Sequence, residues 1–232
     1  MKAVIFAAGK GTRMLPLTEH TNKVLIPVNG KPFLWYVIDT LQKAGVTDLG
    51  IVVSYKQDQI EKFLSQFNIQ ATLIHQDQPL GTGHALKCAA SFVGRGNFLV
   101  CPGDNLVSIA DIKRVIGDAA RPQLLGLRHE HPEHYGVLQV ENGLLKHVVE
   151  KPKQFIGDLI NTGVYFFTND IFTHLKNISR QASGEYYLTD AVTALAHVRP
   201  VRVLTIEGFW LDLGKPTDVP IVEEELHRRK IY

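Results

Sequence analysis

The sequence predicts an α/β fold in which a mostly parallel mixed sheet is covered by helices on both faces. Short apolar runs alternate with amphipathic stretches through the first half of the chain, a pattern typical of βαβ units. The second half differs, because Asn142-Gly143 separates two apolar runs, and Asn-Gly in this position predicts a β-hairpin. We therefore expect an antiparallel insertion in the second half.

The expected elements follow in chain order. In the first half, helices are expected at 33–44, 57–67 and 83–92, between strands at 3–7, 49–54, 71–75 and 98–101. In the second half, strands are expected at 137–140, 144–149, 163–167 and 201–206, with helices near 188–196 and 219–229. Together they predict a Rossmann-like arrangement, a mixed sheet sandwiched by helices.

The composition is that of an ordinary globular domain. Hydrophobic residues make up 45% and charged residues 21% of the 232 residues. No repeat or low-complexity linker divides the chain, so we expect a single domain over 1–232. The net charge of +2 gives no overall field that would attract nucleic acid or an anionic membrane. Cys88 and Cys101 form no Cys-x-x-Cys pair, which fits two small buried hydrophobes in a reducing compartment.

The N-terminal apolar run ends at Ala8 in a glycine loop with no small-residue cleavage pattern, so we do not expect a signal peptide. No stretch approaches the roughly 20 consecutive apolar residues of a membrane span. These features predict a cytoplasmic protein.

A glycine-rich loop directly follows the first predicted strand. Gly9 and Gly11 allow backbone N–H groups to approach phosphate oxygens, and Arg13 can bind a phosphate with two hydrogen bonds. A tight strand-to-helix turn would explain the same glycines. Met14 stands where the dinucleotide pattern G-x-G-x-x-G needs its third glycine, which disfavours a nicotinamide dehydrogenase, and the Lys-Ser/Thr end of a P-loop is also missing.

The residues after this loop make the pattern far more specific. The string AAGKGTRM is followed by PLT and then by NKVLIPVNGKP. In this order it resembles the opening signature of the sugar-1-phosphate nucleotidyltransferase family. The resemblance extends to about residue 220. It implies that the loop wraps a nucleoside triphosphate and that an arginine and a lysine contact phosphates. By resemblance, the nucleotide-binding positions here are Ala8, Gly9, Gly11, Thr12, Arg13 and Lys23.

The segment after the third predicted strand reads QDQPLGTGHA. Glutamine amides can donate to and accept from a pyrimidine imide edge, although a polar loop before a helix start would look the same. The resembled family reads its base here, at positions that correspond to Gln76, Gln78, Gly81 and Thr82. The string LGTGHA is similar to uridylyltransferases acting on N-acetylglucosamine 1-phosphate, which favours uracil over thymine. We expect His84 to be a packing or helix-start residue.

Two aspartates are the candidate metal ligands. Asp104 follows an apolar strand in a Gly-Asp pair, where it suits Mg²⁺ or simply caps a loop. Asp212 lies in a late Trp-x-Asp-x-Gly-x-Pro motif that matches the family. The resemblance implies that both hold Mg²⁺. His129, His131 and His134 also cluster, but their spacing fits no standard zinc signature.

The second half carries four segments that resemble the family's sugar-binding set. Taken singly, each has an ordinary explanation as solvated surface or packing. In family order they imply a sugar-binding half at about 131–232, after a nucleotide-binding half at about 1–130. The residues concerned are Gly136, Glu150, Lys151, Asn161, Glu185 and Tyr187.

The resemblance implies transfer of a nucleotidyl group from UTP or dTTP to a sugar 1-phosphate, with Arg13, Lys23 and Lys151 as the catalytic cations. A thymidylyltransferase, a dual UTP/dTTP enzyme and a catalytically silent regulatory binder on the same fold are the alternatives. Homo-oligomers are common in the family. Bifunctional relatives continue into a repeat domain, so we expect no acetyltransfer by this chain.

Overall fold

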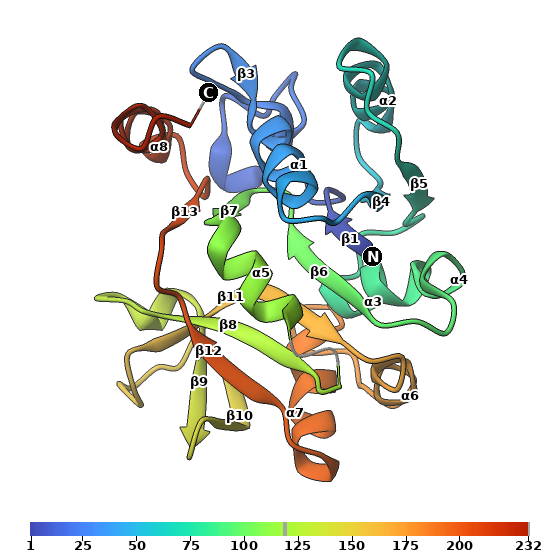
Figure 1. Ribbon diagram of the computed structural model, residues 1–232, viewed down its shortest axis with the longest axis vertical. Helices are drawn as coiled ribbons and strands as arrows, with labels where there is room; N and C mark the ends of the chain where they lie inside the picture. Colours follow the sequence, from blue (N-terminus) through green and yellow to red (C-terminus); the bar gives the residue numbers. More distant parts are fainter. Residues whose placement is uncertain (118–119, 232) are drawn as a thin grey trace.

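The computed structural model describes residues 1–117 and 120–231. Within them, the main sheet has the strand order β5-β4-β1-β6-β11-β8-β12-β10-β9 (Figure 1). Its strands, in chain order, are β1 (Lys2–Phe6), β4 (Asp48–Val53), β5 (Thr72–His75), β6 (Phe98–Pro102), β8 (Gln123–Arg128), β9 (Gly136–Glu141), β10 (Leu144–Glu150), β11 (Leu159–Phe167) and β12 (Arg202–Thr205).

The first half of the sheet is parallel. β1 pairs in parallel with β4 and β6, and β4 pairs in parallel with β5. β1 and β6 read as continuous apolar runs because helices cover both of their faces. Parallel strands end at the same edge of the sheet, so the loops after β1, β5 and β6 meet there.

The second half is mixed. β11 runs antiparallel to both β6 and β8, whereas β12 runs parallel to β8. β9 and β10 form the expected hairpin, with Leu144 opposite Glu141 at its turn and Glu150 opposite Gly136 at its open end. This hairpin lies at the opposite end of the molecule from α2 (Figure 1). The predicted α/β class with an antiparallel insertion is therefore confirmed.

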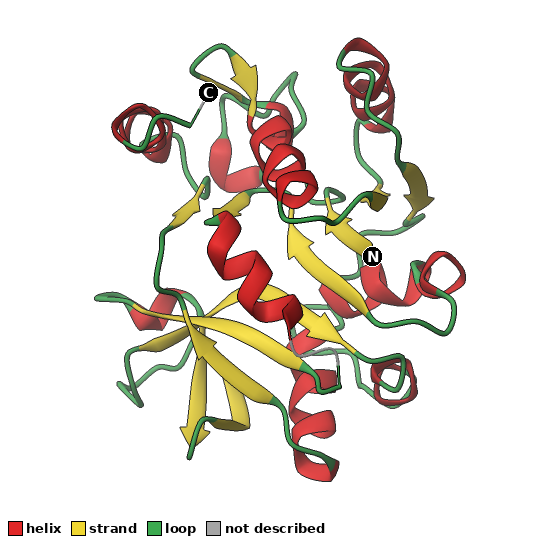
Figure 2. Cartoon of the chain, in the orientation of Figure 1, coloured by secondary structure: helices red, strands yellow, loops and turns green. Residues whose placement is uncertain are grey.

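Helices pack against both faces of the sheet (Figure 2). Successive residues of β1 point to opposite faces, so Ala3 and Ile5 enter one core while Val4 enters the other. Helices α1, α2, α5 and α8 contribute to the first core, and α3, α4, α6 and α7 to the second. Their bounds are α1 (Phe33–Lys43), α2 (Gln57–Gln66), α3 (Thr82–Cys88), α4 (Ala90–Val93), α5 (Ile109–Gly117), α6 (Ile171–Leu175), α7 (Leu188–Val198) and α8 (Asp218–Arg228).

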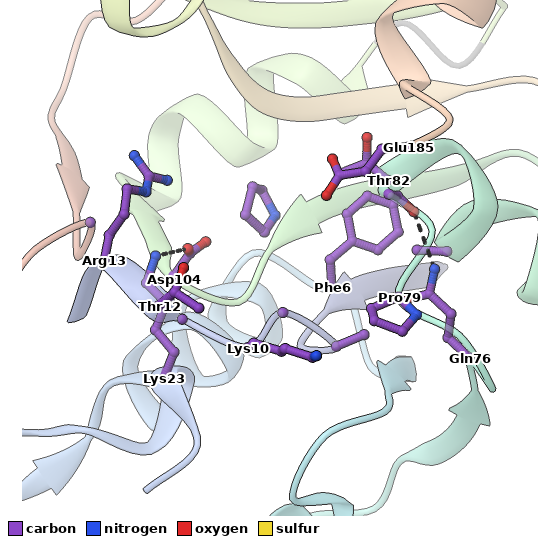
Figure 3. A pocket seen from close by; sticks show the side chains of 17 residues that line it. Phe6, Lys10, Thr12, Arg13, Lys23, Gln76, Pro79, Thr82, Asp104 and Glu185 are labelled. Carbon is purple, nitrogen blue, oxygen red and sulfur yellow. Dashed lines mark hydrogen bonds and ion pairs between the residues drawn. The ribbon is translucent and has the colours of Figure 1, made fainter. Parts of the chain in front are cut away.

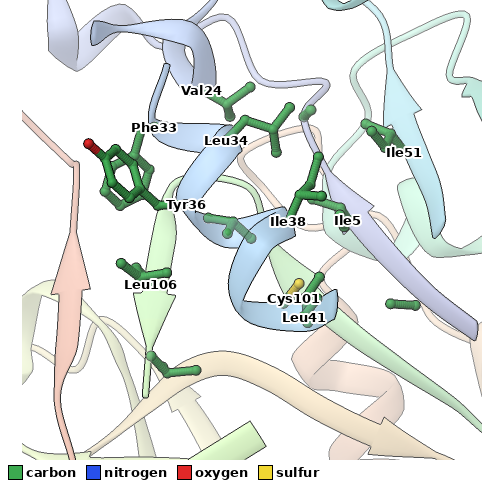
Figure 4. Packing of buried hydrophobic residues seen from close by; sticks show 14 of the residues in the cluster. Ile5, Val24, Phe33, Leu34, Tyr36, Ile38, Leu41, Ile51, Cys101 and Leu106 are labelled. Carbon is green, nitrogen blue, oxygen red and sulfur yellow. The ribbon is translucent and has the colours of Figure 1, made fainter. Parts of the chain in front are cut away.

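The first core holds the parallel strands in place. Figure 4 shows Leu34, Ile38 and Leu41 of α1 packed over Ile5 and Ile51 of the sheet, and all five are 2% exposed or less. Burying one such side chain stabilises the fold by about 1.5–3 kcal/mol. This packing fixes the strand ends from which the site loops leave.

Several short elements complete the chain. Among the described residues, two ribbons lie outside the main sheet and three single-turn 3-10 helices lie in loops. They are β2 (Pro27–Val28) with β3 (Lys31–Pro32), β7 (Asn105–Val107) with β13 (Trp210–Asp212), η1 (Thr12–Met14), η2 (Lys23–Leu25) and η3 (Pro132–His134).

Three differences from the expected elements stand out. The helix expected at 83–92 is two helices, since α3 ends at Cys88 and α4 begins at Ala90. The strand expected at 163–167 is the second half of the longer β11. Helices α5 and α6, strand β8 and the β2–β3 and β7–β13 ribbons were not predicted from the sequence. None of the described helices is both long and apolar enough to cross a bilayer.

Candidate active site

A cavity of about 620 Å³ opens at the carboxyl ends of the parallel strands. Its walls include Phe6 and Pro102, the last residues of β1 and β6. Figure 3 shows Arg13, Lys23 and Asp104 at one end of the cavity and Gln76, Pro79 and Thr82 at the other, with Phe6 and Lys10 between them. The complete lining is Phe6, Ala8, Gly9, Lys10, Gly11, Thr12, Arg13, Lys23, Gln76, Pro79, Gly81, Thr82, Ala85, Pro102, Asp104, Glu185 and Gly214.

The glycine loop is shaped by its contact with Lys23. Gly11 has φ = 65°, and a Cβ at this position would lie 2.9 Å from the Cβ of Lys23. Only glycine fits both requirements, a left-handed backbone and a close approach. Thr18 Oγ1 donates a hydrogen bond of 2.8 Å to the Gly11 carbonyl, which fixes the loop from the other side.

Lys23 reaches the cavity from a rigid support. The side chain of Asn22 accepts a hydrogen bond from the Val24 N–H and donates one to the Tyr55 carbonyl, so η2 is held at its start. Lys23 itself is only 9% exposed, and its Nζ lies 2.5 Å from Asp104 Oδ2. A buried charge needs such a partner, and this ion pair supplies it.

The second aspartate, Asp212, is the last residue of β13 in the β7–β13 ribbon. Asp212 lies opposite Asn105, the neighbour of Asp104, and the Leu213 N–H donates to the Asp104 carbonyl over 2.9 Å. Burial, the largest cause, and the nearby Asp104 carboxylate together raise the pKa of Asp212 to about 7 against the opposing effect of Lys23. Two carboxylates thus stand close enough to repel each other.

This donor set fits Mg²⁺. Mg²⁺ prefers one or two carboxylates together with substrate phosphates, and a divalent cation would relieve the repulsion between Asp104 and Asp212. In residues 1–117 and 120–231, no three His, Cys, Asp or Glu side chains gather into a metal-binding cluster. Substrate oxygens would have to complete the coordination. The His129 ring lies among aromatic rings instead, 5.0 Å from Tyr135 between centroids.

Tyr135 supports Asp212. Its ring contacts Trp210 edge-on, with 5.7 Å between the centroids, and its hydroxyl faces the Asp212 carboxylate. Burial, the largest cause, raises the pKa of Tyr135 together with the charge of Asp212 and a hydrogen bond to it, to about 12 in all. The phenol therefore stays protonated and can donate to Asp212. Tyr135 is a functional candidate that the sequence did not indicate, because its contact with Asp212 joins segments far apart in the chain.

The opposite end of the cavity is built on the start of α3. Gly81 has φ = 92°, and a Cβ there would lie 2.7 Å from the Tyr186 carbonyl. That carbonyl accepts from the Gly83 N–H, and the Tyr186 N–H donates to the Leu80 carbonyl, each over 2.8 Å. Glu185, expected on the sugar side, lines the cavity here beside Gly81 and Thr82.

Three further sugar-side residues lie together at the open end of the β9–β10 hairpin. Gly136 and Glu150 face each other across the β9–β10 hairpin, and Thr189 Oγ1 donates to Glu150 Oε1 over 2.8 Å. The surrounding protein removes part of the hydration of Glu150, which raises its pKa. The Lys151 N–H donates to the Tyr135 carbonyl over 3.0 Å, so this group adjoins Asp212 through Tyr135.

Two of the expected sugar contacts are engaged within the protein. Asn161 Nδ2 donates to the Tyr165 hydroxyl, and Asn161 Oδ1 accepts from the Gly163 N–H. Tyr187 donates to Ser183 Oγ over 2.8 Å. A sugar hydroxyl would have to compete with these bonds.

Most of the expected nucleotide side lines one cavity. Outside its lining lie Gln78, Gly136, Glu150, Lys151, Asn161, Tyr187 and Asp212. The lining residues that the sequence analysis missed are Phe6, Lys10, Pro79, Ala85, Pro102 and Gly214. Lys10 could have been predicted from the sequence, because it lies between the two glycines of the loop. The other five are identified only by their position in the folded structure.

Residues 2–228 match the family model described as nucleotidyl transferase. The chain belongs to the nucleotidyl transferase family. This nucleotidyl transferase chain is 36% identical over 225 residues to a bifunctional sugar-1-phosphate nucleotidylyltransferase/acetyltransferase of Sulfurisphaera tokodaii, with 94% of the chain and 54% of that protein covered. It is also 36% identical over 228 residues to a glucose-1-phosphate thymidylyltransferase of Streptomyces griseus, with 94% of the chain and 64% of that protein covered. The chain thus spans less than two thirds of either relative.

The fold of the nucleotidyl transferase chain recurs in solved structures. A putative glucose-1-phosphate thymidylyltransferase from Bacillus anthracis superposes with a TM-score of 0.87 at 26% identity, covering 97% of this chain and 94% of the other. A UDP-glucose pyrophosphorylase from Acinetobacter baumannii superposes with a TM-score of 0.86 at 25% identity, covering 99% and 94%. The resemblance drawn from the glycine loop and its following motifs is confirmed at the level of the family.

Proposed function

We propose that this chain transfers a nucleotidyl group from UTP or dTTP to a sugar 1-phosphate and releases pyrophosphate. The observation that carries the proposal is the meeting of Lys23, Asp104 and Asp212 beside the glycine loop. One buried cation and two facing carboxylates suit a triphosphate bound together with a divalent cation. The names of the relatives support this class of reaction and include both thymidylyl and uridylyl transfer.

The chemistry is an in-line displacement. An oxygen of the sugar 1-phosphate attacks the α-phosphorus, a new P–O bond forms, and the bond to the β-phosphate oxygen breaks as pyrophosphate leaves. The attacking oxygen is already anionic, so alignment and charge neutralisation contribute more than a general base. Arg13 and Lys23 offset the charge of the triphosphate, and Lys151 steadies the attacking phosphate.

Asp104 and Asp212 are the residues that would hold Mg²⁺, with Lys23 balancing Asp104. Bound Mg²⁺ supplies charge neutralisation at the phosphates. The backbone of the glycine loop, from Ala8 to Thr12, lines the same cavity and can donate N–H groups to phosphate oxygens.

The two ends of the cavity suggest where the rest of the nucleotide and the sugar bind. We assign the base to the end formed by Gln76, Gly81 and Thr82, with Gln78 of the same loop as a further contact from outside the lining. The sugar is assigned to the neighbouring hairpin. Its proposed contacts are Gly136 and Glu150 at the open end of the hairpin, the following Lys151, Asn161 on β11, and Glu185 and Tyr187 in the segment before α7.

The test is pyrophosphate release with Mg²⁺, crossing UTP, dTTP, CTP, GTP and ATP with the 1-phosphates of glucose, N-acetylglucosamine, galactose and mannose. A rate that requires both a triphosphate and a sugar phosphate is expected with UTP or dTTP. Nucleotide binding without turnover for any pair would contradict catalysis and favour a regulatory binder on the same fold.

A further inference from the structure

The side chain of Gln76 is held by two hydrogen bonds at one end only. Gln76 follows the last residue of β5 and is 3% exposed. Its Nε2 donates to the Gly81 carbonyl over 3.2 Å and lies 3.0 Å from Nδ1 of His84. Both protons of the amide nitrogen are therefore engaged when the His84 ring carries its own proton on Nε2.

The other end of the amide faces the cavity. Gln76 Oε1 accepts no hydrogen bond within the described part of the chain, yet none of the described side chains leaves a polar atom buried without a partner. Gln76 Oε1 must therefore reach solvent. Because Gln76 lines the cavity, this oxygen is open to a molecule bound there.

His84 is the stronger of the two restraints on the amide. The Gly81 carbonyl also accepts a hydrogen bond of 3.0 Å from the Ala85 N–H in the first turn of α3. It is therefore shared between two donors, and its bond from Gln76 is longer, at 3.2 Å, than the 3.0 Å contact with His84. Within the described residues, Gln76 is the one hydrogen-bond partner of His84 Nδ1. Its position is fixed because α3 begins on the Tyr186–Leu188 segment, where Thr82 Oγ1 accepts the Leu188 N–H over 3.1 Å.

The direction of the amide has a chemical consequence. Uracil and thymine present an imide N–H between two carbonyls, and this N–H can donate to Gln76 Oε1. Cytosine presents a lone pair at the same ring nitrogen, which would face Oε1 and repel it. A site whose buried acceptor is fixed in this way rejects the wrong base because the two groups are left unpaired.

We propose that His84 is a positioning residue that selects uracil or thymine over cytosine, by holding the Gln76 amide with its oxygen toward the base. This inference rests on the proposed function, since it assumes that a nucleoside triphosphate binds in the cavity. His84 touches neither substrate nor reacting atoms and acts through Gln76.

Two substitutions at this position separate the role of His84 from simple packing. His84→Leu keeps a side chain of similar bulk and removes the acceptor. His84→Asn places an oxygen one bond from Cγ, where Nδ1 stands in histidine, and so keeps the acceptor. His147→Leu is the matched control, because His147 is an exposed histidine on β10 outside the cavity.

Steady-state pyrophosphate release is measured with UTP and with CTP for each protein. For His84→Leu we expect KM for UTP to rise about tenfold and the UTP-to-CTP ratio of kcat/KM to fall about tenfold, the effect of one lost hydrogen bond in a buried site. The kcat with UTP should change less than KM. His84→Asn should restore the ratio to within about threefold, and His147→Leu should match the wild type.

The results distinguish this inference from the proposed function. A wild-type protein that turns over no triphosphate contradicts the proposed function itself. A wild-type protein that prefers UTP, together with a His84→Leu variant that keeps the same preference, overturns only the role of His84.

A measurement on the unsubstituted protein tests the proposal even if the His84 variants fail to fold. ¹⁵N NMR of the His84 imidazole should show Nδ1 as the unprotonated ring nitrogen at neutral pH. A neutral ring that carries its proton on Nδ1 could not accept from Gln76 and would overturn the proposal.

Discussion

Lys23 and Asp104 form an ion pair of 2.5 Å at the floor of the cavity, although 81 residues separate them in the chain. Lys23 comes from the loop after β1 and Asp104 from the loop after β6, and β1 and β6 are neighbours in the sheet. The pair joins two strand ends and places a cation beside a proposed metal ligand. Each partner satisfies the charge of the other before any substrate arrives.

Asp104→Asn is expected to lower turnover at least about 100-fold, because the amide cannot replace the charge of a carboxylate toward Mg²⁺. The measurement is kcat for pyrophosphate release at saturating Mg²⁺, with circular dichroism to verify the fold. Asp58→Asn serves as the control, since Asp58 is an exposed carboxylate on α2. A near-normal rate for Asp104→Asn would mean that Asp104 is not a metal ligand.

Tyr135→Phe tests the support of the second carboxylate. The substitution keeps the ring against Trp210 and removes the hydroxyl that faces Asp212. Loss of such an outer partner typically costs about 10–100-fold in metal affinity or activity. We expect the Mg²⁺ concentration for half-maximal rate to rise about tenfold, while Tyr55→Phe on the exposed Tyr55 leaves it unchanged. Equal Mg²⁺ dependence of the two variants would remove Tyr135 from the site.

Gly11→Ala should disturb both the fold and the site. The left-handed backbone costs about 1–2 kcal/mol for alanine, and the new methyl group would press on the side chain of Lys23. Gly143→Ala is a matched control with φ = 74° and no atom within 4 Å of its added Cβ. Both variants should lose stability in urea titrations, but only Gly11→Ala should raise KM for the triphosphate. An unchanged KM in Gly11→Ala would show that Lys23 tolerates displacement.

Asp111 is expected to make stability depend on pH. Its side chain is 0% exposed and accepts from Ser108, Arg114 and the N–H groups of Glu207 and Gly208. Burial alone would raise the pKa of Asp111, but these hydrogen bonds outweigh it, so the pKa lies below its usual value. A carboxyl with a lowered pKa in the folded state stabilises the protein above its unfolded pKa of about 3.9, and this contribution is lost as the pH falls through the folded pKa.

The variant Asp111→Asn should therefore be about 2–3 kcal/mol less stable than the wild type near neutral pH. The difference should shrink as the pH falls below about 4, because the wild type then loses the same contribution. Urea unfolding midpoints of both proteins across this range give the measurement. A difference that stays constant with pH would show that the charge of Asp111 does not stabilise the fold.

The parallel half of the sheet could be predicted because each strand and helix carries its own local signal. Apolar runs such as 98–101 and the amphipathic stretch 33–44 recur as β6 and α1. β8 has the sequence QLLGLR. This strand was not predicted, because the glycine and the polar residues at both ends weaken its pattern of apolar residues. The β7–β13 ribbon has three residues on each side and no periodicity to detect.

The residues of the candidate site also differ in whether a local sequence pattern identifies them. Local motifs were enough to nominate Gly11, Lys23 and Asp104, because ordered neighbours along the chain identify them. The contact of Gln76 with His84, the support of Asp212 by Tyr135 and the place of Glu185 beside Gly81 depend on segments brought together by the fold. No pattern within a single segment encodes such contacts.

The β7–β13 ribbon joins two segments that are made at different times during translation. The glycine loop and Asp104 are made before the β9–β10 hairpin, whereas Asp212 is made after it. The first half can begin to fold during translation, since it contains its own sheet and helices. A nascent chain could then hold a formed glycine loop while lacking the second carboxylate. The proposed pair of metal ligands would form only when β13 has paired with β7, so it depends on a segment made after the sugar-side hairpin.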